Sequence, residues 1–377
     1  MHIEEIRLHT VRLPLVAPFT TSFSTQTERN ALLVEVRGTF RTADGVRDVL
    51  GWGECVSGSD PFYSSEYVDG SRHVIEHYLA PALLERQSHT EVTAETVSEI
   101  LGHVVGHPMA KAALEIAILD AELHGRGESL ARYLGATRTS VPSAVSVGIQ
   151  DSIPELLDRV GGYLDEGYAR IKIKIKPGWD IEPVRAIRER FGYRLPLQVD
   201  ANAAFTLVDA PLLRRLDEFN LLLIEQPLGE ADIRQHAKLA AEMSTPMCLD
   251  ESIVSAESAA DAISLGAAAV INIKAGRVGG YLEARKIHDL ARALGVAVWC
   301  GGMLETGIGR AANIALAALP GFTLPGDISS SSRFYATDIT EPFVASGGRM
   351  QVPTGPGIGA EPLPEVMREV TTDVRVL

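Results

Sequence analysis

The feature that most constrains the fold is a series of short apolar segments, each ending in a charged residue. Five such residues follow one another at intervals of 26, 25, 25 and 24 residues: Lys174, Asp200, Glu225, Asp250 and Lys274. A strand, a helix and two loops occupy about that length in a βαβ unit. One charged residue at the same end of each successive parallel strand is typical of an active site at the mouth of a β/α barrel.

The first of these segments, residues 170–177, alternates isoleucine with lysine three times and ends at a proline. A period of two is that of a β-strand. Lys172 and Lys174 share one face, so both are expected to point into the barrel. Their ammonium groups repel one another unless carboxylates lie nearby. Lys176 lies past the end of the strand and is expected to be solvated.

The same alternation of strand and helix continues on both sides of this region. A strand is predicted at 143–148 with its helix at 153–166, a seventh barrel strand at 296–300 and a short eighth strand at 322–324. The fold class predicted is therefore α/β, a TIM-type barrel whose last helix is missing or displaced.

The N-terminal third has a different pattern. Residues 2–14, 30–37 and 49–55 are expected to form antiparallel strands, and residues 65–126 are helical in period. The clearest helix, 109–123, is apolar on most of its circumference and is expected to end at the glycines that follow. A helix of this kind must be covered on several sides, which places it between two domains.

Three parts of the chain are predicted from these patterns. They are an α+β capping domain, the barrel that carries the site, and a Pro- and Gly-rich C-terminal segment that returns to the capping domain, with the bounds 1–128, 129–327 and 328–377.

Composition excludes several classes of function. The chain has 377 residues and a formal charge of −14, which disfavours nucleic acid and anionic membranes as partners. Its three cysteines are odd in number and are expected to be reduced and buried. With no signal peptide or spanning segment at hand, we expect a cytoplasmic protein that acts on a small molecule.

The acidic strand ends suggest a metal centre. Asp200, Glu225 and Asp250 should converge at the mouth of the barrel, where three carboxylates cannot all remain ionised without a cation. Ligands that are all oxygen favour Mg²⁺, with Mn²⁺ or Co²⁺ as substitutes. A single acid at a strand end is more often a solvated or capping group, so the prediction depends on all three.

The lysines suggest acid–base chemistry. Lys174 and Lys274 should face each other across the mouth with the metal between them. A lysine near a second cation has a lowered pKa and can act as a base. Lys172 could lower the pKa of Lys174, and Arg277 that of Lys274. The alternative is that the lysines only neutralise acidic neighbours.

A metal that binds a carboxylate, flanked by two opposed bases, suits removal of the proton α to that carboxylate. The enediolate formed can be reprotonated on its other face, which gives racemisation. It can instead expel a β-leaving group, which gives dehydration.

Several motifs resemble the enolase superfamily, in particular its muconate-lactonising subgroup. They are Lys172-x-Lys174, Asp200-Ala201-Asn202, Ile224-Glu225-Gln226-Pro227, Asp250-Glu251 and Asn272-x-Lys274. The resemblance implies a modified (β/α)7β barrel and lysine bases with Mg²⁺. It also implies supporting roles for Asn202 and Glu251. Ala275, where the family has proline, is a departure.

Other segments narrow the resemblance. Residues 276–281, 299–307 and 324–327 are similar to N-acylamino acid racemases and o-succinylbenzoate synthases, the latter acting in menaquinone biosynthesis. This similarity implies that the protein is a racemase of N-acyl or N-succinylamino acids, an o-succinylbenzoate synthase, or both. We also expect a homo-oligomer (dimer or octamer). A dipeptide epimerase or another muconate-lactonising-type enzyme is the alternative. A non-catalytic binding barrel is disfavoured because all five charged strand-end residues are present.

The substrate pocket is predicted less directly. The loop 17–25 pairs two aromatics with small hydroxyls, and it is either a lid or an ordinary hairpin connection. Apolar and small residues expected around the substrate are Phe19, Phe23, Ser146, Gly302, Met303, Leu304 and Phe334. Together they suit an acyl chain or an aromatic ring.

Overall fold

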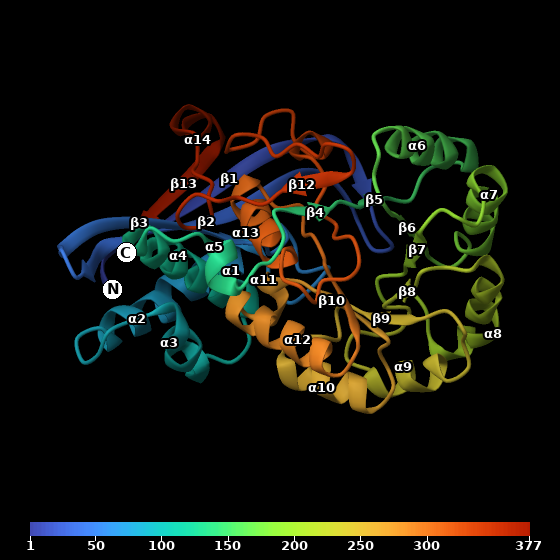
Figure 1. Ribbon diagram of the computed structural model, residues 1–377, viewed down its shortest axis with the longest axis horizontal. Coiled ribbons are helices and arrows are strands. Elements are labelled where there is room, and N and C mark those ends of the chain that lie inside the picture. The colour runs from blue at the N-terminus through green and yellow to red at the C-terminus, as the bar shows by residue number, and fades with distance from the viewer.

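The computed structural model describes residues 1–377 and divides them between an antiparallel sheet and a parallel barrel (Figure 1). The antiparallel sheet has the order β13-β1-β2-β3. Its strands are β1 (His2–Thr20), β2 (Thr25–Thr42), β3 (Gly45–Cys55) and β13 (Thr371–Val376). The predicted strands of the N-terminal third are present and longer than expected, so the turn between the first two shrinks to residues 21–24.

Six helices accompany this sheet and the connection to the barrel. They are α1 (Val68–Val74), α2 (Ala80–Arg86), α3 (Ala94–Ile100), α4 (Pro108–Arg126), α5 (Leu130–Leu134) and α14 (Pro364–Val370). Helix α4 is the apolar helix predicted from the sequence. It runs through Gly125 and ends at Gly127, whose φ of 67° is left-handed. A β-carbon on Gly51 of β3 would lie 2.1 Å from the Ala117 carbonyl oxygen, so glycine permits this close contact of sheet and helix.

The barrel is a curled sheet of seven parallel strands in the order β11-β10-β9-β8-β7-β6-β5. The strands are β5 (Val145–Val147), β6 (Ile171–Lys174), β7 (Leu197–Asp200), β8 (Ile224–Glu225), β9 (Met247–Leu249), β10 (Val270–Ile273) and β11 (Ala297–Cys300). The fold-class prediction is confirmed, since barrel and antiparallel sheet are both present.

Helices follow the barrel strands, and most of them lie along its outer side (Figure 1). They are α6 (Ile153–Asp165), α7 (Ile181–Phe191), α8 (Ala210–Leu213), α9 (Ile233–Ala240), α10 (Ala256–Ser264), α11 (Ala275–Val278), α12 (Tyr281–Ala293) and α13 (Gly307–Ala317). Helix α6 shows why the sequence forms them: the Ser152 side chain accepts a hydrogen bond from the Glu155 backbone N–H at its start. Its buried residues Leu156, Val160 and Tyr163 recur at helical spacing and face the core.

The predicted eighth strand, 322–324, is wrong as a strand. Phe322 makes a single parallel bridge to Val298, and Gly326 makes one to Ser143. The segment therefore touches both edges of the seven-stranded sheet and closes the barrel. Prolines 320 and 325 flank it and have no backbone N–H to donate to a continuous ladder.

The C-terminal segment crosses back from the barrel to the antiparallel sheet. Strand β12 (Arg349–Gln351) pairs with β4 (Ser140–Pro142), and β13 then pairs with β1 from Arg7↔Val376 onward. Both termini thus lie on the side of the antiparallel sheet (Figure 1). One continuous hydrophobic core extends through both parts and includes Cys55 and Cys300, whereas Cys248 lies in a small separate cluster with Trp299. All three cysteines are buried and unpaired, as expected. No helix combines the length and apolar character needed to cross a bilayer.

Candidate active site

The five charged residues of the repeating pattern lie together at one end of the barrel strands. Lys174, Asp200 and Glu225 are the last residues of β6, β7 and β8, and Lys174 pairs in register with Asp200, as Asp200 does with Glu225. Asp250 and Lys274 directly follow β9 and β10. All five are at least nine-tenths buried, so their charges interact in a poorly solvated space.

On the β6 side, Lys174 donates to two neighbours. Its Nζ lies 2.6 Å from Oδ2 of Asp200 and 2.7 Å from Oδ1 of Asn202. Lys172 points inward as predicted, with its Nζ 3.2 Å from oxygens of both Asp200 and Glu225. The Asn202 amide in turn donates to Glu251 at 3.0 Å. The predicted supporting residues of this side therefore form one connected network.

On the β10 side, the Lys274 ammonium lies 2.8 Å from Oδ2 of Asp250 and 3.0 Å from the hydroxyl of Tyr63. The same ammonium sits 4.9 Å from the centre of the Tyr63 ring, a cation–π arrangement. Arg277 donates to the other oxygen of Asp250 and, through Nη2, to the Asn272 carbonyl at 2.7 Å. Arg277 is thus bound to the acid rather than placed against the lysine.

The pKa of Lys274 differs from the prediction. Burial acts to lower this pKa, but the Asp250 carboxylate and then Tyr63 outweigh it and raise the pKa above its ordinary value. The expected lowering by Arg277 is present only as a smaller opposing effect. The predicted lowering is wrong because the Asp250 carboxylate, which Lys274 and Arg277 share, outweighs the second cation.

The three strand-end carboxylates are electrostatically unequal. Burial, followed by the adjoining Asp200, raises the pKa of Glu225 well above its usual range. Burial opposes ionisation of Asp200 too, but the ammonium groups of Lys174 and Lys172 hold its pKa below the usual range. Glu225 is therefore the acid that most lacks a compensating positive charge.

The carboxylates do not form a ready chelating cluster in this conformation. No three acidic, histidine or cysteine side chains are placed to hold one ion together. Lysine ammonium groups lie among the oxygens instead, with Lys172 bridging Asp200 and Glu225. The donor set nonetheless fits a hard divalent cation, because it consists of three buried carboxylates from adjacent strands. Lys172 compensates the charge of Glu225 only in part, since the pKa of this acid remains well above its usual range.

All seven residues predicted for the substrate pocket line one cavity of about 110 Å³, together with Lys172, Lys174 and Lys274. The tip of the β1–β2 hairpin reaches over it: Phe19 meets Phe334 edge-to-face at 6.0 Å, and Phe23 lies 6.3 Å from Tyr63. Leu304 has a left-handed φ of 58°, an uncommon conformation that turns this loop at the cavity wall.

Several residues of the site were not predicted. Tyr63 comes from the loop after β3, and its pairing with Lys274 bridges 211 positions of sequence. Asp327 lies 2.6 Å from the Lys172 ammonium and 2.7 Å from Arg170. Arg29 and Arg310 also line the cavity. A carboxylate after the last barrel segment was a usable signal for Asp327, whereas nothing in the local sequence marks Tyr63 or Arg29.

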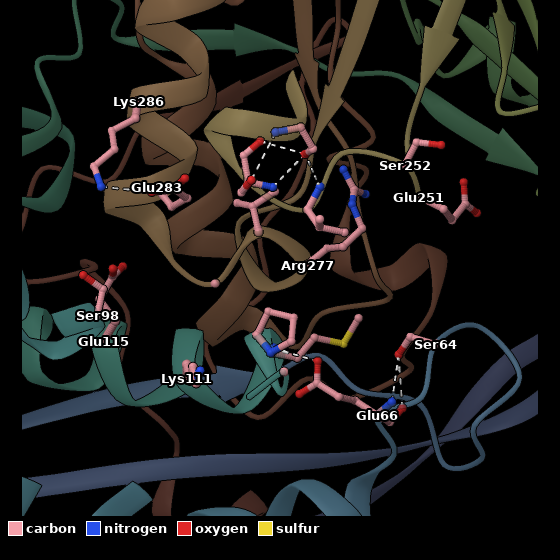
Figure 2. Close-up of a pocket in the computed structure, with 18 of the residues that line it drawn as sticks. Ser64, Glu66, Ser98, Lys111, Glu115, Glu251, Ser252, Arg277, Glu283 and Lys286 are labelled. Atoms are coloured by element: carbon pink, nitrogen blue, oxygen red, sulfur yellow. Dashed lines mark hydrogen bonds and ion pairs between the residues drawn. The ribbon is translucent and has the colours of Figure 1, made fainter. Parts of the chain in front are cut away.

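A second, larger cavity of about 970 Å³ lies between helix α4 and helices α10 and α12 of the barrel (Figure 2). Lys111 and Glu115 project from α4, and Glu283 and Lys286 pair with each other at 3.0 Å on α12. None of the five charged strand-end residues lines it. Size alone therefore does not identify the reaction centre.

Comparisons with known proteins cover the whole chain. Residues 3–135 match the N-terminal domain of the mandelate racemase / muconate lactonizing enzyme family, and residues 155–366 match the enolase C-terminal domain-like family. An N-succinylamino acid racemase from Amycolatopsis sp is 61% identical over 99% of this chain and 98% of its own. An o-succinylbenzoate synthase from Geobacillus stearothermophilus is 46% identical over 95% and 93%.

A solved structure of the enolase superfamily is also similar to this chain. The crystal structure of an enolase-superfamily member from Listeria innocua superposes with a TM-score of 0.92, at 39% identity, and covers 100% of this chain and 99% of that one.

Proposed function

This chain is an enzyme of the mandelate racemase / muconate lactonizing enzyme family in the enolase superfamily, and we propose that it removes the proton α to the carboxylate of an N-acylamino acid. The reaction is then racemisation, with N-succinylamino acids as substrates. The same site also suits dehydration to o-succinylbenzoate in menaquinone biosynthesis, a reaction favoured by the relatives named as synthases.

One observation carries this proposal. Two lysine ammonium groups, on strands separated by three others, open into the same cavity, and each touches a strand-end carboxylate. A pair of acid–base groups on opposite walls is what reprotonation on either face of an α-carbon requires. A purely structural pair has no need of a shared cavity.

We propose that Asp200, Glu225 and Asp250 hold Mg²⁺, which Mn²⁺ or Co²⁺ can replace. Family members of this kind use a divalent metal, and the bound ion supplies positive charge that stabilises the substrate's developing enediolate. The ion would need carboxylate oxygens that Lys174 and Lys274 contact in this structure, so their ammonium groups would be free to face the substrate when it is bound.

The remaining roles belong to the protein's own groups. Lys174 and Lys274 each hold or accept a proton on one face of the α-carbon. Lys172, anchored by Asp327 at 2.6 Å, keeps positive charge beside Asp200 and Glu225. Asn202 positions the Lys174 ammonium at 2.7 Å and links it to Glu251. Burial and the neighbouring Asp250 raise the pKa of Glu251 to about 7.

Dipeptide epimerisation is the alternative within the family. An epimerase must hold the free amine of its substrate, which requires an uncompensated carboxylate in the cavity. Asp327, which lines the cavity, could serve as this carboxylate, but it is paired with both Arg170 and Lys172. Its charge is therefore already used, and a neutral N-acyl group fits the site better than an amine.

The test is to assay the Mg²⁺-loaded protein in parallel with N-succinyl, N-acetyl and dipeptide substrates and for o-succinylbenzoate formation. Polarimetry and ultraviolet absorbance follow the two reactions. We expect turnover of N-succinylamino acids in both directions. Turnover of dipeptides alone would favour dipeptide epimerisation. The absence of activity with every substrate would favour a non-catalytic binding protein. Sedimentation velocity would measure the homo-oligomer that we also expect.

A further inference from the structure

Arg29, on β2, is a cation in the wall of the reaction cavity that the chemistry described above does not use. Its side chain is buried, with 3% of the residue exposed, and its Nη1 donates to the Ser57 carbonyl at 2.8 Å. Its other donors, Nε and Nη2, are buried and have no hydrogen-bond partner in the protein. Arg29 lines the same cavity as Lys174 and Lys274.

An arrangement of this kind calls for an anion. A guanidinium presents its donors in a planar fork that matches a carboxylate, and buried donors left without partners are costly. The buried carboxylate of Glu54, on β3, uses its oxygens on the backbone N–H groups of Thr306 and Gly309, at 3.0 to 3.1 Å. It forms no ion pair with Arg29.

A second guanidinium strengthens the positive character of this wall. Arg310 also lines the cavity, where its Nη groups donate to the Ser329 and Glu305 carbonyls while its Nε has no partner. Cationic side chains therefore line the cavity at two places: the lysines at the strand ends, and the arginines between β2 and α13. The cavity's two carboxylates, Asp327 and Glu305, are already bound by other groups of the protein. A ligand that satisfies both places carries two negative groups.

We propose that Arg29 binds the terminal carboxylate of a succinyl group and is the residue that favours succinyl over uncharged acyl substrates. This inference rests on the proposed function and names the substrate class of that site. Two relatives are named for different molecules, a substrate and a product, that share the succinyl group. One arginine that binds the carboxylate of the succinyl group would contribute to substrate binding in both racemisation and dehydration.

The rival role for Arg29 is structural. Burial raises the pKa of Glu54 to about 7, and the positive charge of Arg29 is the largest influence acting against that rise. If compensation of Glu54 were its only task, removing Arg29 would weaken the fold and affect all substrates equally. The experiment must therefore compare two substrates that differ only in the terminal charge.

The test uses the Mg²⁺-loaded enzyme with the N-succinyl and N-succinamoyl derivatives of one amino acid, the second being the uncharged amide isostere. For Arg29→Met we expect kcat/KM to fall about ten- to a hundredfold for the succinyl substrate, mostly through KM, because hydrogen bonds to charged groups are the strong ones. The succinamoyl substrate should change by less than about threefold on the same reasoning.

Arg333→Met is the matched control. Arg333 is also a guanidinium with a buried, unpartnered Nε, and it packs 5.2 Å from the Phe334 ring, but it does not line the cavity. Any effect of this substitution should be equal for both substrates. Arg29→Lys, which keeps a cation without the fork, should give an intermediate loss and replaces Arg29→Met if that variant does not fold.

Equal losses for the two substrates in Arg29→Met, or a wild-type enzyme that does not prefer succinyl, would overturn the proposal. Its failure is distinguishable from failure of the proposed function, because calorimetric binding of o-succinylbenzoate requires no turnover. If the wild-type protein were inactive but Arg29→Met bound o-succinylbenzoate at least about tenfold more weakly than the wild type, the proposed function would fail. The role of Arg29 in binding the succinyl carboxylate would stand.

Discussion

The two lysines that face the substrate cavity have different surroundings. Lys174 is held by polar groups of the barrel itself, the Asp200 carboxylate and the Asn202 amide. Lys274 is held by Asp250 from the barrel and by Tyr63 from the antiparallel part of the molecule, whose hydroxyl and ring both contact it. A residue that depends on two parts of the molecule is sensitive to how they fit together.

This difference argues against treating the lysines as equivalent. The Lys174 network lies within adjacent strands and is set when the barrel folds. The Lys274 environment is complete only when the loop after β3 is in place. We therefore expect the two lysines to share the requirement for metal but to differ in what else they need.

The largest effect tests what the two sides share. Exhaustive chelation should abolish activity on both faces, and Mg²⁺, Mn²⁺ or Co²⁺ should restore it. Asp250→Asn should be nearly inactive, with kcat/KM at least about a thousandfold lower, because it removes a charge from the metal ligands and the partner of Lys274 together. Circular dichroism should show that the variant is folded. Full turnover after chelation would contradict the metal site.

The next effect separates the two sides. Lys174→Ala and Lys274→Ala should each abolish racemisation in both directions, because every turnover uses both lysines. Each variant should still exchange the α-proton of the enantiomer that faces its surviving lysine. Deuterium incorporation in D₂O, followed by NMR with each enantiomer, measures this preference. If both variants exchange the same enantiomer, the two-face model is wrong.

A smaller effect asks whether Lys274 acts as a base or only as a charge. The family resemblance implies that, in dehydration, Lys174 would remove the proton and later protonate the leaving hydroxide, while Lys274 would stabilise the intermediate. Lys274→Arg should then retain more dehydration than racemisation, because arginine keeps the charge but is a very poor base. Steady-state rates of the two reactions on one preparation give the ratio, and equal losses would assign Lys274 the same role in both.

The comparison also shows which parts of the site were predictable. Lys174, Asp200 and Glu225 could be placed because strand parity and a spacing of about 25 residues fix where a parallel strand ends and which way its last side chain points. These are local rules, so one sequence suffices. The barrel could be predicted from the same repeat. The eighth segment was mistaken for a strand because three residues are too short to distinguish a strand from a segment that makes only isolated bridges.

The unpredicted residues depend on tertiary contacts. Tyr63 reaches Lys274 across 211 positions, and Asp327 reaches Arg170 across 157. No local pattern encodes such a meeting. The raised pKa of Lys274 was missed for the same reason, since its sign depends on the 2.8 Å separation from Asp250 and not on which charged residues neighbour it in sequence.

The smallest effects come from the tip of the β1–β2 hairpin, whose two aromatics contact different sides of the cavity. Phe19 meets Phe334 of the C-terminal segment, whereas Phe23 lies against Tyr63, the partner of Lys274. If this tip is a lid, Phe19→Ala should raise KM or shift acyl preference by about three- to tenfold with little change in Tm, because lids belong to the weakly packed part of a structure.

Phe23→Ala is the matched variant, and it sharpens the contrast between the lysines. Phe23 is 38% exposed, so its removal costs little stability, but it uncovers the Tyr63 ring. We expect slower α-proton exchange with the enantiomer that faces Lys274 and little change with the other. Phe19→Ala should show no such facial preference. If the free energy of unfolding fell as much as on truncation of a buried core phenylalanine, about 3–5 kcal/mol, with unchanged kinetics, the hairpin tip would be structural and not a lid.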